Sequence, residues 1–214
     1  MIGWRKAEAG QAAPLYIAAV VGVLFVALVL FAFGEADIRR NGAQSAADAA
    51  ALAVAKESRS LLEPDLKAHL ADPKFFESVF SASYLGRTGN VCRKASDFAA
   101  RNKADGVRCR PLADGRWGYE VRLKSAKGMS TDIVPGTKGR KAEATAVAVI
   151  EPRCAFVPAE TSALDSDPDA DADPPSVPIG RIHCDGGPDW SVDPEDPSLV
   201  PDVVDLFTVR LAED

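Results

Sequence analysis

Hydrophobic and polar positions divide the chain into an uncharged apolar stretch near the N-terminus and a longer mixed region behind it. The apolar core runs from Leu15 to Phe33 and contains no charged residue. As a helix rising about 1.5 Å per residue, it would be roughly 28 Å long, close to the ~30 Å hydrocarbon core of a bilayer. A cleaved signal peptide is the alternative, but the apolar region is long for one, and Gly34-Glu35-Ala36 is a poor cleavage site. We predict a transmembrane helix over 15–33, preceded by a cytoplasmic leader over 1–14.

The same helix is expected to continue beyond the membrane over residues 34–60. This segment has no proline and is rich in alanine between Ala46 and Ala55, and alanine has the highest helix propensity. Small residues that recur along its faces would let another backbone approach closely. These candidate packing residues are Gly42, Ala43, Ala46, Ala47 and Ala50. They could pack against a neighbouring helix or against the chain's own domain, and the sequence leaves both alternatives open.

The remaining pattern predicts an α+β head. Residues 61–85 have the spacing of one or two short amphipathic helices, and 94–104 that of another. Alternating apolar and polar positions predict strands over 107–112, 117–123, 141–150 and 207–211, and Asp114-Gly115 is typical of a hairpin turn. We expect an antiparallel sheet in a head over 61–157, an acidic Pro/Asp-rich linker over 158–178 and C-terminal strands over 179–214 that complete the head. A second Pro/Asp-rich stretch, 185–201, is expected to be a loop.

Four cysteines, Cys92, Cys109, Cys154 and Cys184, all follow the apolar stretch. Paired spacings typical of zinc ligands are missing, so two disulfides in an oxidising compartment are the better explanation. Three pairings are open, and the sequential one (Cys92 with Cys109, Cys154 with Cys184) is the simplest. The basic residues flanking the span nearly balance. The disulfides therefore set the predicted orientation, with the N-terminus cytoplasmic and the head extracytoplasmic.

The charge distribution is uneven although the formal net charge is only −6. That overall balance argues against a nucleic-acid partner. Residues 86–127 are nevertheless strongly basic, and 155–214 strongly acidic. The basic region, including Arg108, Arg110, Arg116 and Arg122, could recognise an anionic ligand on the cell surface, or the acidic C-terminal region could neutralise it.

Catalytic chemistry has little support in the sequence. The two histidines, His69 and His183, do not belong to a recognisable catalytic motif, and no phosphate-binding or nucleophile motif is present. Alternating aspartates over 165–173 lack the glycine and closing glutamate of a common calcium loop. We expect no enzymatic activity, no cofactor or metal, and no small-molecule substrate.

Two parts of the N-terminal third resemble a known family. They are Gly10-Gln11-Ala12-Ala13-Pro14-Leu15-Tyr16-Ile17 and the run from Arg39 to Ala53, which contains Asp48 within a polar, alanine-rich sequence. Together with the apolar span, this stretch is similar to the N-terminal module of Tad/Flp pilus-assembly proteins of the TadE/TadG type. The resemblance covers about residues 10–55, and the rest of the chain resembles no family that we can name.

This resemblance implies a pilin-like plan, with a single N-terminal helix for insertion and a structural role in a thin surface pilus. The implied partners are membrane lipid and other pilus-assembly or pilin-like subunits. Some family members are cleaved by a prepilin peptidase after a glycine, which here would place the cut between Gly10 and Gln11. Leu15 departs from that pattern, because pilins of this kind usually carry glutamate five residues after the cut.

Overall fold

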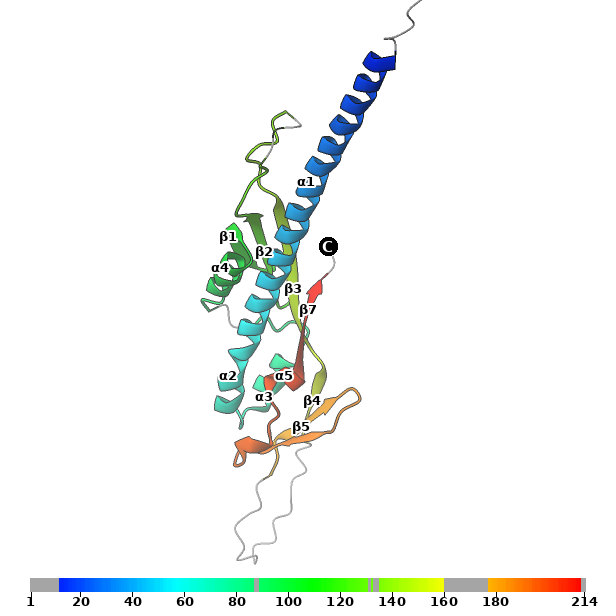
Figure 1. The fold of residues 1–214 in the computed structure, drawn as a ribbon. Coiled ribbons are helices and arrows are strands. Elements are labelled where there is room, and N and C mark those ends of the chain that lie inside the picture. Colours follow the sequence, from blue (N-terminus) through cyan, green and yellow to red (C-terminus); the bar gives the residue numbers. More distant parts are fainter. Residues whose placement is uncertain (1–11, 87–88, 131, 133–134, 160–176, 213–214) are drawn as a thin grey trace, which may run out of the picture.

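A single long helix dominates the molecule. The computed structural model describes residues 12–212 except 87–88, 131, 133–134 and 160–176. Helix α1 runs without interruption from Ala12 to Ser60, and its first half projects from the head while its second half packs on the head (Figure 1). The prediction that one helix joins the apolar stretch to the alanine-rich segment is confirmed. Among the described residues, it is the one helix long and apolar enough to cross a membrane.

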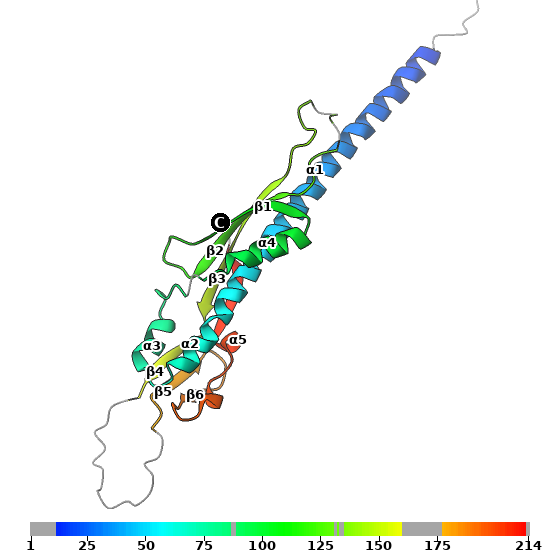
Figure 2. The same cartoon turned by 90° about the vertical axis from the view of Figure 1, so that its left-hand side faces the viewer.

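The head is built around a four-stranded antiparallel sheet in the order β1-β2-β3-β7. Its strands are β1 (Ala104–Pro111), β2 (Gly118–Ser125), β3 (Glu143–Pro152) and β7 (Phe207–Ala212). Helix α1 packs against β2 and β3, and α4 (Cys92–Arg101) packs beside it against β1 (Figure 2). The α+β class and the antiparallel sheet are confirmed.

Alternation along β2 decides which side of the sheet is covered. Tyr119, Val121 and Leu123 are buried, whereas Arg122 and Lys124 between and beyond them are exposed. On β3, Ala144, Ala146 and Ala148 are buried on the same face, while Val147 and Val149 are buried on the opposite one. Successive side chains on a strand point to opposite faces, so the buried residues of β2 and these alanines form the surface that receives α1. Small alanines on both elements let the helix and the sheet approach closely.

A second, smaller sheet lies beyond the C-terminal end of α1. It contains β4 (Cys154–Pro158), β5 (Gly180–Cys184) and β6 (Trp190–Val192), in that order. Two short helices, α2 (Leu62–Ala68) and α3 (Pro73–Val79), confirm the helices expected over 61–85. Asp72 caps α3 by accepting from the backbone N–H groups of Lys74 and Phe75. A 3₁₀ turn, η1 (Pro197–Leu199), and α5 (Val203–Leu206) lead into β7.

Some expectations about local structure need correction. The helix expected over 94–104 ends at Arg101, because Lys103 has a positive φ of 57° and β1 already begins at Ala104. Strand β1 therefore starts earlier than expected, with an irregular register between Asp105 and Arg108 where Gly106 also has a positive φ. Glycine adopts a positive φ without steric cost, which suits Gly106 to this β-bulge.

The stretch 185–201 was expected to be a loop, but it contains β6 and η1. β6 has only three residues, which are too few for an alternation of apolar and polar positions to predict a strand. Of the predicted C-terminal strands, only β7 joins the main sheet, whereas β5 and β6 belong to the smaller one. The aspartates over 165–173 and the Gly10–Gln11 position lie outside the described residues.

Candidate interaction sites

The projecting half of α1 is an apolar surface that the described residues leave open. Phe25, Leu28 and Phe31 are each more than half exposed, as are most large side chains between residues 15 and 33. Exposed apolar surface of this extent marks a site that is covered by lipid or by another protein. By length and composition, this half of α1 is a candidate membrane span.

The alanine-rich half of α1 is instead used within the chain. Ala43, Ala46, Ala47 and Ala50 are at most 1% exposed and belong to the core shared with the sheet. Of the two alternatives left by the sequence, packing on the chain's own domain therefore holds for these four residues. Gly42 differs, because it is exposed and a side chain there would meet nothing within 4 Å.

A buried polar cluster fastens the end of α1 to the sheet. Trp117 Nε1 donates to Ser58 Oγ at 3.0 Å, and the Tyr119 hydroxyl lies 3.0 Å from the same oxygen. Burial raises the pKa of Tyr119, only partly offset by this hydrogen bond. Beside the cluster, Arg59 Nη1 donates to the carbonyl of Phe207 at 2.9 Å. Desolvation lowers the pKa of Arg59.

At the other end of the head, Glu35 holds the loop between β2 and β3 against α1. Its Oε1 accepts from Arg39 Nη2 at 2.7 Å and from the backbone N–H of Ser130 at 3.0 Å, while Oε2 accepts from Ser130 Oγ at 2.8 Å. Arg39 Nη1 also donates to the carbonyl of Lys127 at 3.2 Å. Arg39, followed by Ser130, lowers the pKa of Glu35.

Two disulfides brace the head, as predicted. Cys92–Cys109 joins the start of α4 to β1, and Cys154–Cys184 joins β4 to β5 at positions that face each other in register. The pairing is the sequential one. Each bridge crosses between elements that come together only in the folded chain, so both fix the tertiary arrangement.

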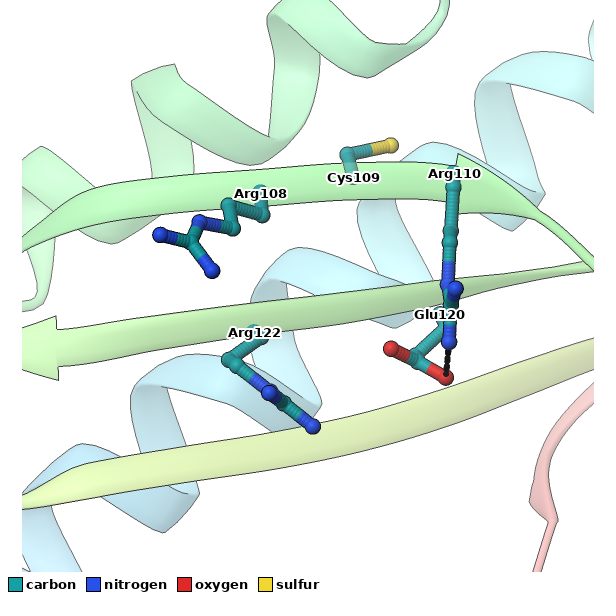
Figure 3. A pocket seen from close by; sticks show the side chains of 5 residues that line it. All are labelled: Arg108, Cys109, Arg110, Glu120 and Arg122. Atoms are coloured by element: carbon teal, nitrogen blue, oxygen red, sulfur yellow. Dashed lines mark hydrogen bonds and ion pairs between the residues drawn. The ribbon is translucent and has the colours of Figure 1, made fainter.

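The exposed face of β1 and β2 carries charged side chains, most of which are paired. Arg110 Nη2 donates to Glu120 Oε2 at 2.8 Å, which lowers the pKa of Glu120 (Figure 3). Lys124 pairs with Glu143 at 2.7 Å in the same way. Arg116 pairs with Asp114 in the turn between the strands. The carboxylates of Glu120, Glu143 and Asp114 are therefore each already paired with a basic side chain.

Arg108 and Arg122 are the exception on this face. They are direct cross-strand partners, and neither forms an ion pair with any described residue. Arg122 Nε donates to Thr145 Oγ1 at 3.2 Å. Together with Cys109, Arg110 and Glu120 they line a shallow hollow of about 220 Å³ (Figure 3). Like charges directly opposite on a sheet destabilise it, so the excess positive charge of the face is concentrated at this pair.

Among the described residues, no carboxylate of the C-terminal region forms an ion pair with this surface. There, the ion pairs of the basic region involve Glu57, Asp114, Glu120 and Glu143, all of which precede residue 155, and Asp105 is paired with Lys141. The acidic stretch 160–176 lies outside the described residues.

The two histidines occupy exposed structural positions. His69 Nδ1 lies 2.8 Å from the carbonyl of Asp65, and its ring stacks on Phe75. His183 Nδ1 lies 2.6 Å from Asp189 Oδ1. Within the residues that the structure describes, no three metal-ligating side chains come together.

Sequence reasoning did not identify Ser58 or the Glu35–Ser130 contact. A signal for Ser58 was present, because it continues the face formed by Ala47, Ala51 and Val54 at helical spacing. A polar residue on an otherwise apolar buried face needs a partner. The contact of Ser130 with Glu35 spans 95 positions and carries no local sequence signal.

These features define the class of protein: an α+β head carried on one N-terminal helix that has the length and composition of a membrane anchor. A comparison with protein families finds a match over residues 10–57 to the family described as "Putative Flp pilus-assembly TadE/G-like". The N-terminal module of this chain is thus TadE/G-like, as its residues suggested. No curated protein and no solved structure matched the chain. The matched residues coincide with α1 almost from end to end.

Proposed function

We propose that this protein is a membrane-anchored structural component of Tad/Flp-type pilus assembly, or a minor pilin-like subunit. In this proposal the N-terminus is cytoplasmic, the head is extracytoplasmic, and the protein acts through contacts rather than catalysis. The observation that carries it is the family match over residues 10–57, which supports a role in pilus assembly. The exposed apolar half of α1 and the two disulfides support the membrane anchor and the oxidising compartment of the head.

Contacts with other subunits would use the side of α1 that faces away from the head. Ile38 is 75% exposed, and the exposed Gly34 and Gly42 lie one turn before and after it. Residues four apart share one face of a helix, and small residues there allow another helix to come close. The buried alanines are unavailable for this purpose, because they already pack against the sheet.

Deletion of the protein, followed by complementation, tests this role. The deletion strain is expected to lose surface pili, and the wild-type chain to restore them. Gly42→Leu adds bulk where nothing in the described chain lies within 4 Å, so the head should fold but pili should not return. Lys56→Leu, another exposed position on α1, is the matched control and should restore them. Pili of normal number and length on the deletion strain would sink the proposal.

A second candidate function rests on the unpaired arginines. Arg108 and Arg122 form no close ion pair among the described residues, although both help to lower the pKa of Glu143, and the guanidinium group favours phosphate and carboxylate oxygens. The candidate is a surface-displayed module that binds an anionic polymer. Binding of the full chain in detergent to polyphosphate should be lost in Arg108→Glu/Arg122→Glu and kept in Arg93→Glu/Arg181→Glu. Equal binding by both variants would rule this function out.

A further inference from the structure

The loop between β2 and β3, residues 126–142, is bound to α1 at the point where its apolar stretch ends. Glu35 receives both the backbone N–H and the hydroxyl of Ser130, and Arg39 donates to the carbonyl of Lys127. The loop runs beside α1 towards its projecting half in both views (Figures 1 and 2). The height of this loop along the helix axis is therefore fixed by side chains of α1.

That height can be placed relative to a membrane. Glu35 is two residues beyond Phe33, which corresponds to about 3 Å along the helix axis. A headgroup layer adds roughly 5–7 Å to each side of the hydrocarbon core. If 15–33 fills the core, Ser130 lies within the headgroup layer of the adjacent leaflet.

Burial along α1 agrees with this placement. Ala32 is only 6% exposed, although its neighbours Phe31 and Phe33 are 67% and 65% exposed. Ala32 and Glu35 are three positions apart and share one face of the helix. The chain thus covers this side of α1 at least as far as the last turn of the apolar stretch.

The chemistry of the loop suits an anionic surface. Lys127, Lys138 and Arg140 are exposed and form no ion pair within the described residues. The one acid among the described loop residues, Asp132, accepts from the backbone N–H groups of Thr137 and Lys138 and is therefore engaged in the turn. Basic side chains close to a membrane are attracted to anionic lipid headgroups.

We infer that the described part of this loop forms a second membrane contact, in which Lys127, Lys138 and Arg140 bind the phosphate groups of anionic lipids. This contact rests on the proposed membrane insertion of α1. Together with the span it holds the head at two points, which restricts the tilt and rotation of the head relative to the bilayer. A transmembrane helix without this second contact would restrict neither the tilt nor the rotation of the head.

Spin labels on the full chain in lipid nanodiscs test this contact. The four native cysteines are disulfide-bonded, so one added cysteine can be labelled selectively. A label at Leu24→Cys reports insertion of α1, and a label at the exposed Pro135→Cys reports the loop. Each is measured by collision with an aqueous nickel chelate, in phosphatidylcholine alone and in a mixture with phosphatidylglycerol.

The label at position 135 is expected to become at least about two-fold less accessible to the chelate when phosphatidylglycerol is present. Lys127→Glu/Lys138→Glu/Arg140→Glu should abolish that shielding. The matched control, Lys56→Glu/Arg93→Glu/Arg181→Glu, changes charge equally at exposed sites elsewhere and should retain it. Retained disulfides, checked by intact mass, show that each variant is folded.

The outcomes separate the two proposals. A label at position 24 shielded by lipid, with a label at 135 that is equally accessible in both lipid mixtures, would overturn the loop contact and leave the membrane anchor standing. Shielding that persists in the triple glutamate variant would also overturn it. A label at position 24 that the aqueous chelate reaches freely would overturn the membrane anchor, and the loop contact with it.

Discussion

The hydroxyl groups of Ser58 and Tyr119 lie 3.0 Å apart in the buried interface between α1 and β2. Trp117 Nε1 donates to the same serine oxygen, so one small side chain satisfies two aromatic residues of the sheet. This cluster lies at the C-terminal end of α1, whereas the Glu35 contact lies near the middle of the helix, at the other end of the head. The half of α1 that packs on the head is thus fastened at both of its ends, and the buried alanines Ala43, Ala46, Ala47 and Ala50 pack between the two contacts.

Ser58→Ala should lower the free energy of unfolding by about 2–3 kcal/mol, because it leaves Trp117 Nε1 and the Tyr119 hydroxyl buried without this partner. Urea denaturation of the oxidised full chain in detergent measures this. Ser60→Ala is the control, since Ser60 is exposed, and should change stability by less than about 0.5 kcal/mol. Equal effects of the two substitutions would show that the buried cluster contributes little.

Position 47 tests the close approach of α1 to the sheet. Ala47→Leu adds bulk at a fully buried position and should destabilise the protein by about 1–3 kcal/mol. Gly42→Ala, on the exposed side of the same helix, should instead stabilise it by about 0.5–1 kcal/mol, because alanine restricts the unfolded chain. The same urea titration measures both. A neutral Ala47→Leu variant would contradict the tight packing described above.

The Glu35–Ser130 contact should depend on pH. Its hydrogen bonds to Arg39 and Ser130 lower the pKa of Glu35 below the ordinary value of 4.5. A carboxylate whose pKa is lowered on folding contributes stability that is complete above 4.5 and is lost as the pH falls through the lower folded value. The amide resonance of Ser130 should therefore shift with a midpoint below 4.5.

Two variants separate this titration from that of neighbouring acids. Glu35→Gln should remove the shift of the Ser130 amide, whereas Asp37→Asn should leave it unchanged. A midpoint at or above the ordinary value in the unsubstituted chain would contradict the hydrogen-bonded arrangement.

Both disulfides should contribute measurably to stability. In the chain-entropy account, Cys92–Cys109 closes a 17-residue separation and Cys154–Cys184 one of 30. Replacing each pair by serine should cost about 3 and about 3.5 kcal/mol respectively. Intact mass before and after reduction, with a gain of about 4 Da in the unsubstituted chain, verifies that both bridges are present. No gain on reduction would remove the evidence for an oxidising location of the head.

Reversing one charge of the arginine pair should stabilise the sheet. Arg108→Glu places a carboxylate opposite Arg122, and the thermal midpoint should rise at low salt. High salt should reduce that gain, because both side chains are exposed and their interaction is screened. Arg110→Glu is the contrasting variant, since it breaks the pair with Glu120 and should lower the midpoint. A rise in both variants would indicate a general effect of charge rather than this pair.

Much of the architecture could be predicted from local pattern. Residues 15–60 predict one helix because apolar length and alanine content act within neighbouring turns, and β2 is predicted by an alternation that its own side chains carry. Boundaries were less predictable. The end of α4 and the start of β1 depend on the positive φ values at Lys103 and Gly106, which the register of the sheet imposes.

By itself the sequence determined the helix, the class of the head, the disulfide count and the likeness of residues 10–57 to a pilus-assembly module. The helix, the class of the head and the disulfide count follow from composition and from spacings within a few turns or strands, whereas the likeness is a resemblance of particular residues to a family. Only the tertiary structure decided which side of α1 is buried, which arginines are left unpaired, and that Ser130 meets Glu35 beside the apolar stretch. Those relationships join positions tens of residues apart, and they arise from the packing of α1 across the sheet, which no local pattern encodes.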